Sequence, residues 1–89
     1  MITEATMASM IFSLLRDKND TALDGGSELI QLLTEKFDCK DLMPDSRVSS
    51  ERYMQGNIEH RLGLELVMQQ AAATLAEILC DRFEFTPKA

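Results

Sequence analysis

The sequence predicts an all-α protein, a small bundle of about four helices in which the C-terminal helix is long. Apolar residues recur at alternating intervals of three and four positions through most of 57–83, which is the spacing of one helical face. No segment alternates polar and apolar residues for long enough to predict a strand. With 45% hydrophobic residues, the 89-residue chain is expected to fold as a single domain, 1–89.

The predicted long helix carries more apolar surface than one small chain can cover. A helix of about 26 residues is roughly 39 Å long, whereas a compact globule of this chain length has a diameter of about 31 Å. A second apolar stripe runs beside the first, and such a helix is normally buried on several sides. We therefore predict a homodimer through this helix. The residues expected to mediate self-association are Leu64, Met68, Ala71, Leu75 and Ile78.

The N-terminal part, 1–37, is expected to form a pair of helices. Thr3 can cap a first helix over 4–17, because its side-chain oxygen can accept from a free N–H of the first turn. Glu4 in that turn interacts favourably with the helix dipole.

The second helix has two possible starting points. The apolar spacing fits a helix over 21–37, but Gly25 and Gly26 would lie inside it, each at a cost of about 1 kcal/mol relative to alanine. A helix over 27–37 with Ser27 as its cap avoids both glycines. We prefer this shorter helix, preceded by an irregular turn.

The polar segment 38–48 contains Pro44 and is expected to connect the two halves of the chain. The following region, 49–83, is expected to hold a short helix and then the long one. Ser49 or Ser50 can cap the short helix.

Gly56 and Asn57 predict a kink between the short and long helices, and Asn57 can cap the latter. The sequence leaves open whether the two pieces are continuous. The tail 84–89 contains Pro87 and is expected to fray.

The net charge of −6 argues against direct binding of nucleic acid or of an anionic membrane, because both need a basic surface. No apolar run is long enough to span a bilayer, and the first residues lack the basic segment of a secretory signal. We therefore expect a cytoplasmic protein.

The two cysteines are expected to be free thiols. Cys39 and Cys80 lie far apart, form no CxxC motif and have no histidine at ligand spacing. Cys39 is expected in the connection and Cys80 buried in the long helix. A cation beside a thiol lowers the thiol pKa, and Lys40 follows Cys39.

The segment between the first two predicted helices partly matches a calcium-binding loop. An EF-hand takes oxygen ligands at its positions 1, 3, 5 and 12. These positions hold Asp17, Asn19, Thr21 and Glu28. The required glycine at position 6 is replaced by Ala22, so a solvated acidic turn is the preferred interpretation.

Ser27 precedes an amphipathic stretch, and in this respect the chain resembles the acyl carrier proteins, which are also small, acidic and helical. The resemblance implies a phosphopantetheine arm on the serine that follows an aspartate at a helix start. Here Gly26 replaces that aspartate, while the dipeptide Asp45-Ser46 precedes no amphipathic helix. The sequence therefore does not assign the chain to this family.

No catalytic motif is present in the sequence. GxSxG, HExxH and the GxxxxGK[ST] loop are all missing, and His60 has no identifiable nucleophile as its companion. We expect no enzymatic activity, no metal and no cofactor.

The sequence is most consistent with a non-enzymatic regulatory or adaptor protein, such as an inhibitor, a small chaperone or an immunity-type factor, which binds itself and a second, unidentified protein. Six methionines favour this interpretation, since their flexible side chains suit adaptable interfaces. The expected contact residues for that protein are Met43, Arg47, Tyr53 and Met54. An acidic mimic of nucleic acid and a structural subunit of a larger assembly are the alternatives.

Overall fold

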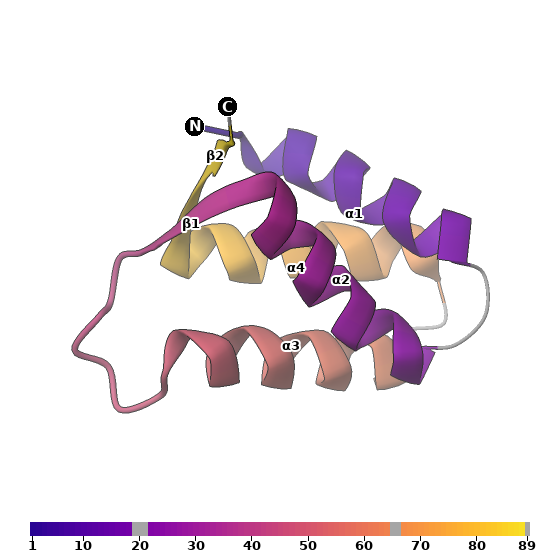
Figure 1. Ribbon diagram of the computed structural model, residues 1–89. Coiled ribbons are helices and arrows are strands. Elements are labelled where there is room, and N and C mark those ends of the chain that lie inside the picture. The colour runs from indigo at the N-terminus through magenta and orange to yellow at the C-terminus, as the bar shows by residue number, and fades with distance from the viewer. Residues whose placement is uncertain (19–21, 65–66, 89) are drawn as a thin grey trace.

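The computed structural model describes residues 1–18, 22–64 and 67–88, with the side chains of 1–17, 28–62 and 67–88. Within this part, the chain forms four helices and two strands (Figure 1). In chain order these are α1 (Glu4–Lys18), α2 (Ala22–Lys36), β1 (Phe37–Asp41), α3 (Ser50–Leu64), α4 (Met68–Arg82) and β2 (Phe83–Pro87). The strands form an antiparallel sheet. The prediction of an all-α fold is therefore wrong, and the architecture is a mixed one dominated by helices.

Two predicted helix caps are confirmed. The amide of Thr6 donates to Thr3 Oγ1 over 3.2 Å at the start of α1. The amide of Arg52 donates to Ser49 Oγ over 3.2 Å at the start of α3. Each bond satisfies an N–H that the first turn of a helix leaves without a helical acceptor. Both helices therefore begin where the local sequence indicates.

The second helix starts earlier than expected. α2 begins at Ala22 rather than at Ser27, so Gly25 and Gly26 lie within it. This is the longer of the two alternatives considered from the sequence. Packing of an apolar face commonly outweighs intrinsic helix propensity, and it does so here despite two glycines.

The predicted long helix over 57–83 is wrong, because two shorter helices occupy this region. α3 ends at Leu64, one residue after Gly63, and α4 begins at Met68. Each has 15 residues, or roughly 22 Å, and fits within the largest extent of the molecule, 34 Å. The two helices lie antiparallel (Figure 1). Folding back in this way lets one subunit cover apolar faces that a continuous rod would leave exposed.

The predicted kink at Gly56 and Asn57 is absent, since both residues lie inside α3. The side chain of Asn57 donates to the carbonyl of Tyr53 over 2.7 Å instead of capping a new helix. A single glycine costs a helix about 1 kcal/mol. Burial of Met54 and Ile58 on the same helix stabilises it by more than that.

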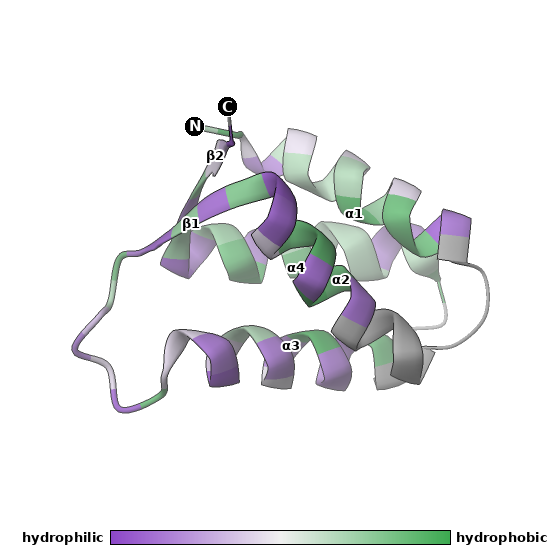
Figure 2. Ribbon diagram, viewed as in Figure 1, coloured by the Kyte–Doolittle hydropathy of each residue, from purple (hydrophilic) through white to green (hydrophobic). Residues whose placement is uncertain are grey.

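The core lies between the four helices and the inner face of the sheet (Figure 2). Its buried apolar residues are Met7, Ile11, Leu15, Leu29, Leu33, Phe37, Met54, Ile58, Leu62, Ala71, Ala72, Leu75, Ala76, Leu79, Phe83 and Phe85. α1 packs mainly on α4, and α2 on α3. Ala71, Ala72 and Ala76 of α4 are buried, and small side chains of this kind allow neighbouring helices a close approach.

The sheet was missed from the sequence because its strands are short and charged. β1 and β2 pair with Cys39 opposite Phe85 and Asp41 opposite Phe83. Side chains alternate across a strand, so the phenylalanines face the core while Asp38 is exposed. The segment 84–89, which was predicted to fray, contains most of β2.

Aromatic contacts join this sheet to the helices. Phe37 and Phe85 meet edge to face with their ring centroids 6.2 Å apart, and Phe83 lies 6.0 Å from both Phe85 and Tyr53. Such pairs contribute about 0.5–1.5 kcal/mol beyond simple burial. These aromatic contacts in the core therefore stabilise the pairing of β2 with β1, in addition to the backbone hydrogen bonds of the sheet.

We predict that Leu75→Ala lowers the free energy of unfolding by about 2–5 kcal/mol, because a fully buried leucine leaves a cavity in the core of one subunit. Urea denaturation monitored by circular dichroism measures this. Met68→Ala is the matched control from the same predicted apolar stripe. Because the Met68 side chain is exposed, this variant should lower the free energy of unfolding by at most about 0.5 kcal/mol. Equal losses for the two variants, both dependent on protein concentration, would show that the stripe is an intersubunit seam.

Candidate functional site

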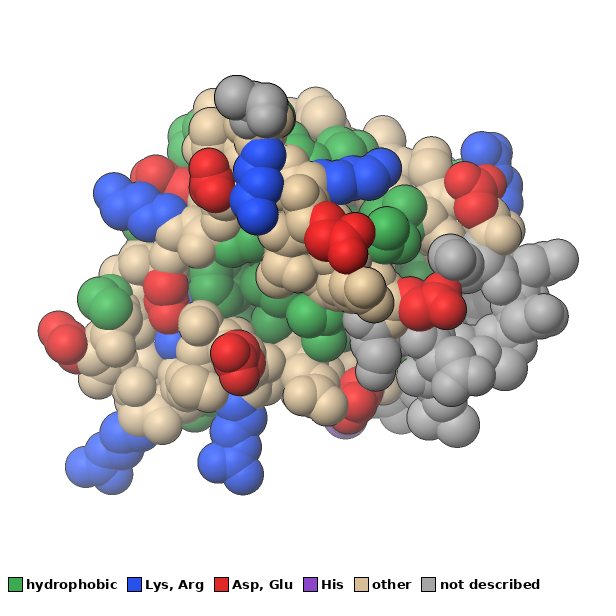
Figure 3. All heavy atoms as spheres, viewed as in Figure 1, with side chains coloured by type: hydrophobic (Ala, Val, Ile, Leu, Met, Phe, Trp, Pro, Cys, Tyr) green, Lys and Arg blue, Asp and Glu red, His purple; other side chains and the backbone are tan. Residues whose placement is uncertain are grey.

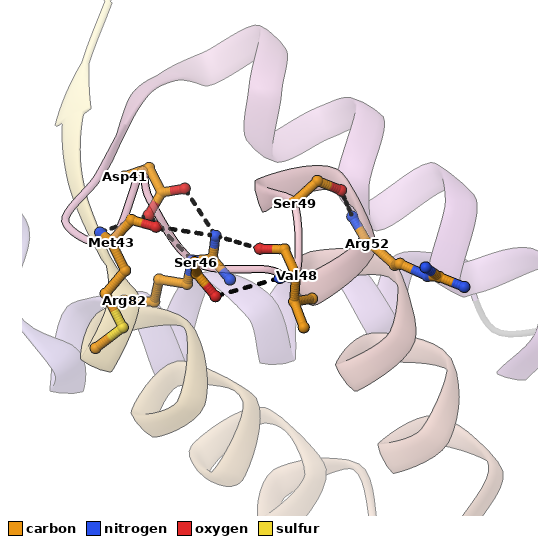
Figure 4. Close-up of polar contacts among 7 residues, drawn as sticks. All are labelled: Asp41, Met43, Ser46, Val48, Ser49, Arg52 and Arg82. Atoms are coloured by element: carbon orange, nitrogen blue, oxygen red, sulfur yellow. Dashed lines mark hydrogen bonds and ion pairs between the residues drawn. The ribbon is translucent and has the colours of Figure 1, made fainter.

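Arg82 is a buried cation at the C-terminal end of α4, with only 2% of its surface exposed. Its Nε donates to Asp41 Oδ1 over 3.0 Å, and its Nη2 donates to Asp41 Oδ2 over 2.9 Å (Figure 4). This two-point geometry is the strong form of an arginine–carboxylate pair. It joins the last residue of α4 to the last residue of β1.

The same guanidinium also binds the backbone of the segment that follows β1. Nη2 donates to the carbonyl of Val48 over 2.7 Å and to that of Met43 over 3.4 Å. The carbonyl of Arg82 in turn accepts from the amide of Leu42 over 2.8 Å. Side chain and main chain of one residue therefore hold both ends of the loop 42–49.

Hydrogen bonds within the loop complete its shape. Asp41 Oδ1 accepts from the amide of Met43 over 2.8 Å, and the carbonyl of Met43 accepts from the amide of Ser46 over 3.1 Å. Ser46 Oγ then accepts from the amide of Val48 over 3.3 Å. Aspartate and serine side chains commonly make such local turns. The loop is folded, although it contains no helix or strand.

Tyr53 of α3 forms one wall of the Arg82 site. The guanidinium lies 4.8 Å from the centre of its ring, within the range of a cation–π contact. The Tyr53 hydroxyl donates to the carbonyl of Ile78 on α4 over 3.1 Å. Tyr53 therefore links α3 and α4 beneath the loop.

The electrostatics agree with a structural ion pair. The hydrogen bond from Arg82 holds the pKa of the Asp41 carboxyl below its usual range, with a smaller contribution from the Met43 amide. Burial raises the pKa of the Tyr53 hydroxyl. Asp41 and Arg82 are therefore charged at neutral pH, while Tyr53 is neutral.

The loop displays apolar side chains to solvent. The exposed fractions of Leu42, Met43 and Val48 are 46%, 51% and 42%, and Arg47 beside them is also exposed. We name these four residues the loop surface. Large apolar side chains concentrated on one short, ordered loop are typical of an interaction site.

The structure places the four predicted contact residues in different surroundings. Met43 and Arg47 belong to the loop surface, and Tyr53 lies half-buried beneath it. Met54 is a core residue with 4% exposure, because it points from α3 to the centre of the bundle. It therefore offers no surface to a binding protein in this conformation.

Sequence reasoning missed four residues of this site. Leu42 and Val48 lie in the segment 38–48, for which the sequence predicts only a connection. Asp41 and Arg82 lie 41 positions apart, and no local pattern reports their pairing. The sequence signal that could have indicated this loop is the apolar residue near each end of a segment that contains Pro44.

The five residues predicted for self-association are also separated. Ala71 and Leu75 are buried within the subunit, Ile78 is half-buried, and Met68 is exposed at the start of α4. The side chain of Leu64 lies outside the described part of the chain. The overlong apolar helix on which the predicted dimer depended is absent, and α4 is covered by α1 and α3 of its own subunit.

The structure describes only some of the residues that the sequence offered for metal binding or catalysis. Among the described residues, no three His, Cys, Asp or Glu side chains are grouped closely enough to hold a metal ion. His60 is exposed on α3. The proposed calcium ligands Asn19 and Thr21 lie outside the described residues, as does the side chain of Ser27.

The surroundings of the two thiols differ from expectation. Cys39 lies in β1 rather than in a loop, and its pKa is raised, because burial outweighs the attraction of a nearby cation, Lys88. Burial likewise raises the pKa of the half-buried Cys80. Neither thiol is activated as a nucleophile, since nucleophilic cysteines have a lowered pKa.

No protein-family model matches the chain, and neither the curated proteins nor the solved structures contain a significant match. Over the described residues, none of the helices combines the length and apolar character needed to cross a bilayer.

We predict that Arg82→Lys lowers the urea midpoint of unfolding and increases exchange of the loop amides with solvent. Lysine keeps the charge but cannot make the two-point contact with Asp41 while also reaching the loop carbonyls. Amide exchange followed by NMR measures the effect at Leu42, Met43 and Val48. Arg47→Lys is the control, and because its side chain is exposed, it should change neither property.

We also predict that the stability of the protein falls as the pH drops below about 4, the unfolded-state pKa of an aspartate. Because the folded-state pKa of Asp41 is lowered, its contribution is complete above that pH and is lost as pH falls through the folded value. Asp41→Asn should reduce stability at pH 7 and flatten the acid limb of a plot of urea midpoint against pH. Asp45→Asn, which alters an exposed carboxyl of the same loop, should retain the wild-type limb.

Proposed function

We propose that this is a non-enzymatic, protein-binding regulatory or adaptor protein that acts in the cytoplasm and contacts its target through the loop surface. The observation that carries the proposal is the exposure of Leu42, Met43 and Val48 on a loop held by Arg82. Exposed apolar side chains on an ordered loop favour binding, because little conformational entropy remains to be lost when the target binds.

The composition of the loop surface indicates the chemistry of the target. Three apolar side chains favour an apolar contact, and methionine adapts its shape to different targets. Arg47 at the border can pair with a carboxylate, and Arg52 follows on the first turn of α3. A protein segment with an apolar residue next to an aspartate or glutamate suits this surface best.

Selection of peptides from a displayed random library on the immobilised protein tests the proposal. We expect enrichment of peptides that combine apolar and acidic residues. The double variant Leu42→Ser/Met43→Ser should weaken binding of those peptides by roughly tenfold or more, as truncation of central apolar contacts does in other interfaces. Isothermal titration calorimetry with synthetic peptides measures the change.

The chain offers a matched control in Val67→Ser/Met68→Ser, which removes two exposed apolar side chains at the start of α4. This variant should bind the peptides as the wild type does. Circular dichroism verifies that both variants are folded. Selection that enriches no sequence, or peptides whose affinity is unchanged by the loop variant, would contradict the proposal.

A further inference from the structure

The two edges of the sheet differ in how their backbone groups are used. The amide of Leu42 donates to the carbonyl of Arg82 at one end of the sheet, and the amide of Lys88 donates to the carbonyl of Lys36 at the other. Because hydrogen-bonded pairs alternate along an antiparallel ladder, the even-numbered residues of β1 and β2 are the ones bonded across the sheet. The backbone groups of odd-numbered residues therefore point to the outer edges of the sheet.

The outer edge of β2 is closed. The carbonyl of Phe85 accepts from the amide of Ile2 over 3.0 Å, and the amide of Phe83 donates to the carbonyl of Leu79. Pro87 has no N–H to offer, and prolines in strands favour such edge positions. A further strand cannot be added on this side.

The outer edge of β1 is open within the described part of the chain. Cys39 and Asp41 direct their backbone N–H and C=O groups away from β2, and no described backbone group bonds them there. β1 packs chiefly against β2 and its sequence neighbour α2. An open edge of this kind is a template for another strand.

We propose that this edge pairs with β1 of a second copy of the chain, in antiparallel register centred on Cys39. The observation that selects this occupant is the charge pattern of β1. Asp38 and Lys40 lie on the exposed face of β1. In this register, Asp38 of each copy lies opposite Lys40 of the other copy. They occupy non-hydrogen-bonded pairs, in which opposite side chains lie closest.

The charges also exclude the neighbouring registers. A shift in one direction places Asp38 opposite its own equivalent, and a shift in the other direction does the same for Lys40. Like charges directly opposite each other destabilise a strand pair. A register that pairs odd-numbered with even-numbered residues would face backbone groups already bonded to β2. Among the registers that pair most of Phe37–Asp41 with itself, only the one centred on Cys39 satisfies both the backbone and the charges.

Apolar surface flanks this edge on the face drawn in Figure 3, where hydrophobic side chains lie between α2 and α3. A second copy along β1 would cover part of it. Because each strand has only five residues, the interface is small and the dimer is expected to dissociate with a constant between about 10 µM and 1 mM.

Variants that reverse the charges at Asp38 and Lys40 test this proposal. Sedimentation velocity at up to about 1 mM protein measures the dissociation constant of the dimer. Asp38→Lys alone and Lys40→Asp alone should each weaken dimerisation by roughly tenfold, since two attractive pairs become repulsive. The double variant Asp38→Lys/Lys40→Asp should restore it. An equimolar mixture of the two single variants should form a heterodimer, because their opposed residues then carry opposite charges.

Exposed residues of α3 supply the controls. Glu59→Lys and Arg52→Asp make the same changes in net charge away from β1 and should leave the dissociation constant unchanged. Circular dichroism checks that every variant is folded. A wild-type protein that stays monomeric at 1 mM would overturn the proposal. So would a dimer that is weakened equally by the control variants, or single variants that fail to associate when mixed.

Discussion

Burial of a single guanidinium is the constraint on which this architecture most depends. An unpaired buried charge is strongly unfavourable, so Arg82 requires the carboxylate of Asp41 and the loop carbonyls as much as the loop requires Arg82. Because Arg82 ends α4 and Asp41 ends β1, this requirement also fixes where β2 can start. The sheet, the loop and the helix end are thus one cooperative unit.

The features predictable from the sequence are those determined by a few neighbouring residues. The caps at Thr3 and Ser49 were identified because capping acts over three residues, and the exposed Met43 and Arg47 were anticipated from the polar character of their segment. The helix break between α3 and α4 was missed because the apolar spacing continues across it, although Gly63 marks the end of α3.

Pairing between distant segments could not be predicted in the same way. Phe37 and Pro87 are partners in the sheet, but β1 contains two aspartates and a lysine and does not have the composition of a typical strand. Its stability comes from phenylalanines on both strands that reach the core, and from the pair made by Asp41. These contacts exist only after the four helices have brought the strands together.

The way in which the loop is held has a consequence for its resistance to proteases. A protease binds its substrate as an extended segment, and exposed loops are its usual points of attack. The loop 42–49 cannot be drawn out without removing Arg82 from the carbonyls of Met43 and Val48. Cleavage at Arg47 therefore requires Arg82 to release the loop carbonyls first, so this exposed loop is expected to resist proteases that would cut an unsupported one.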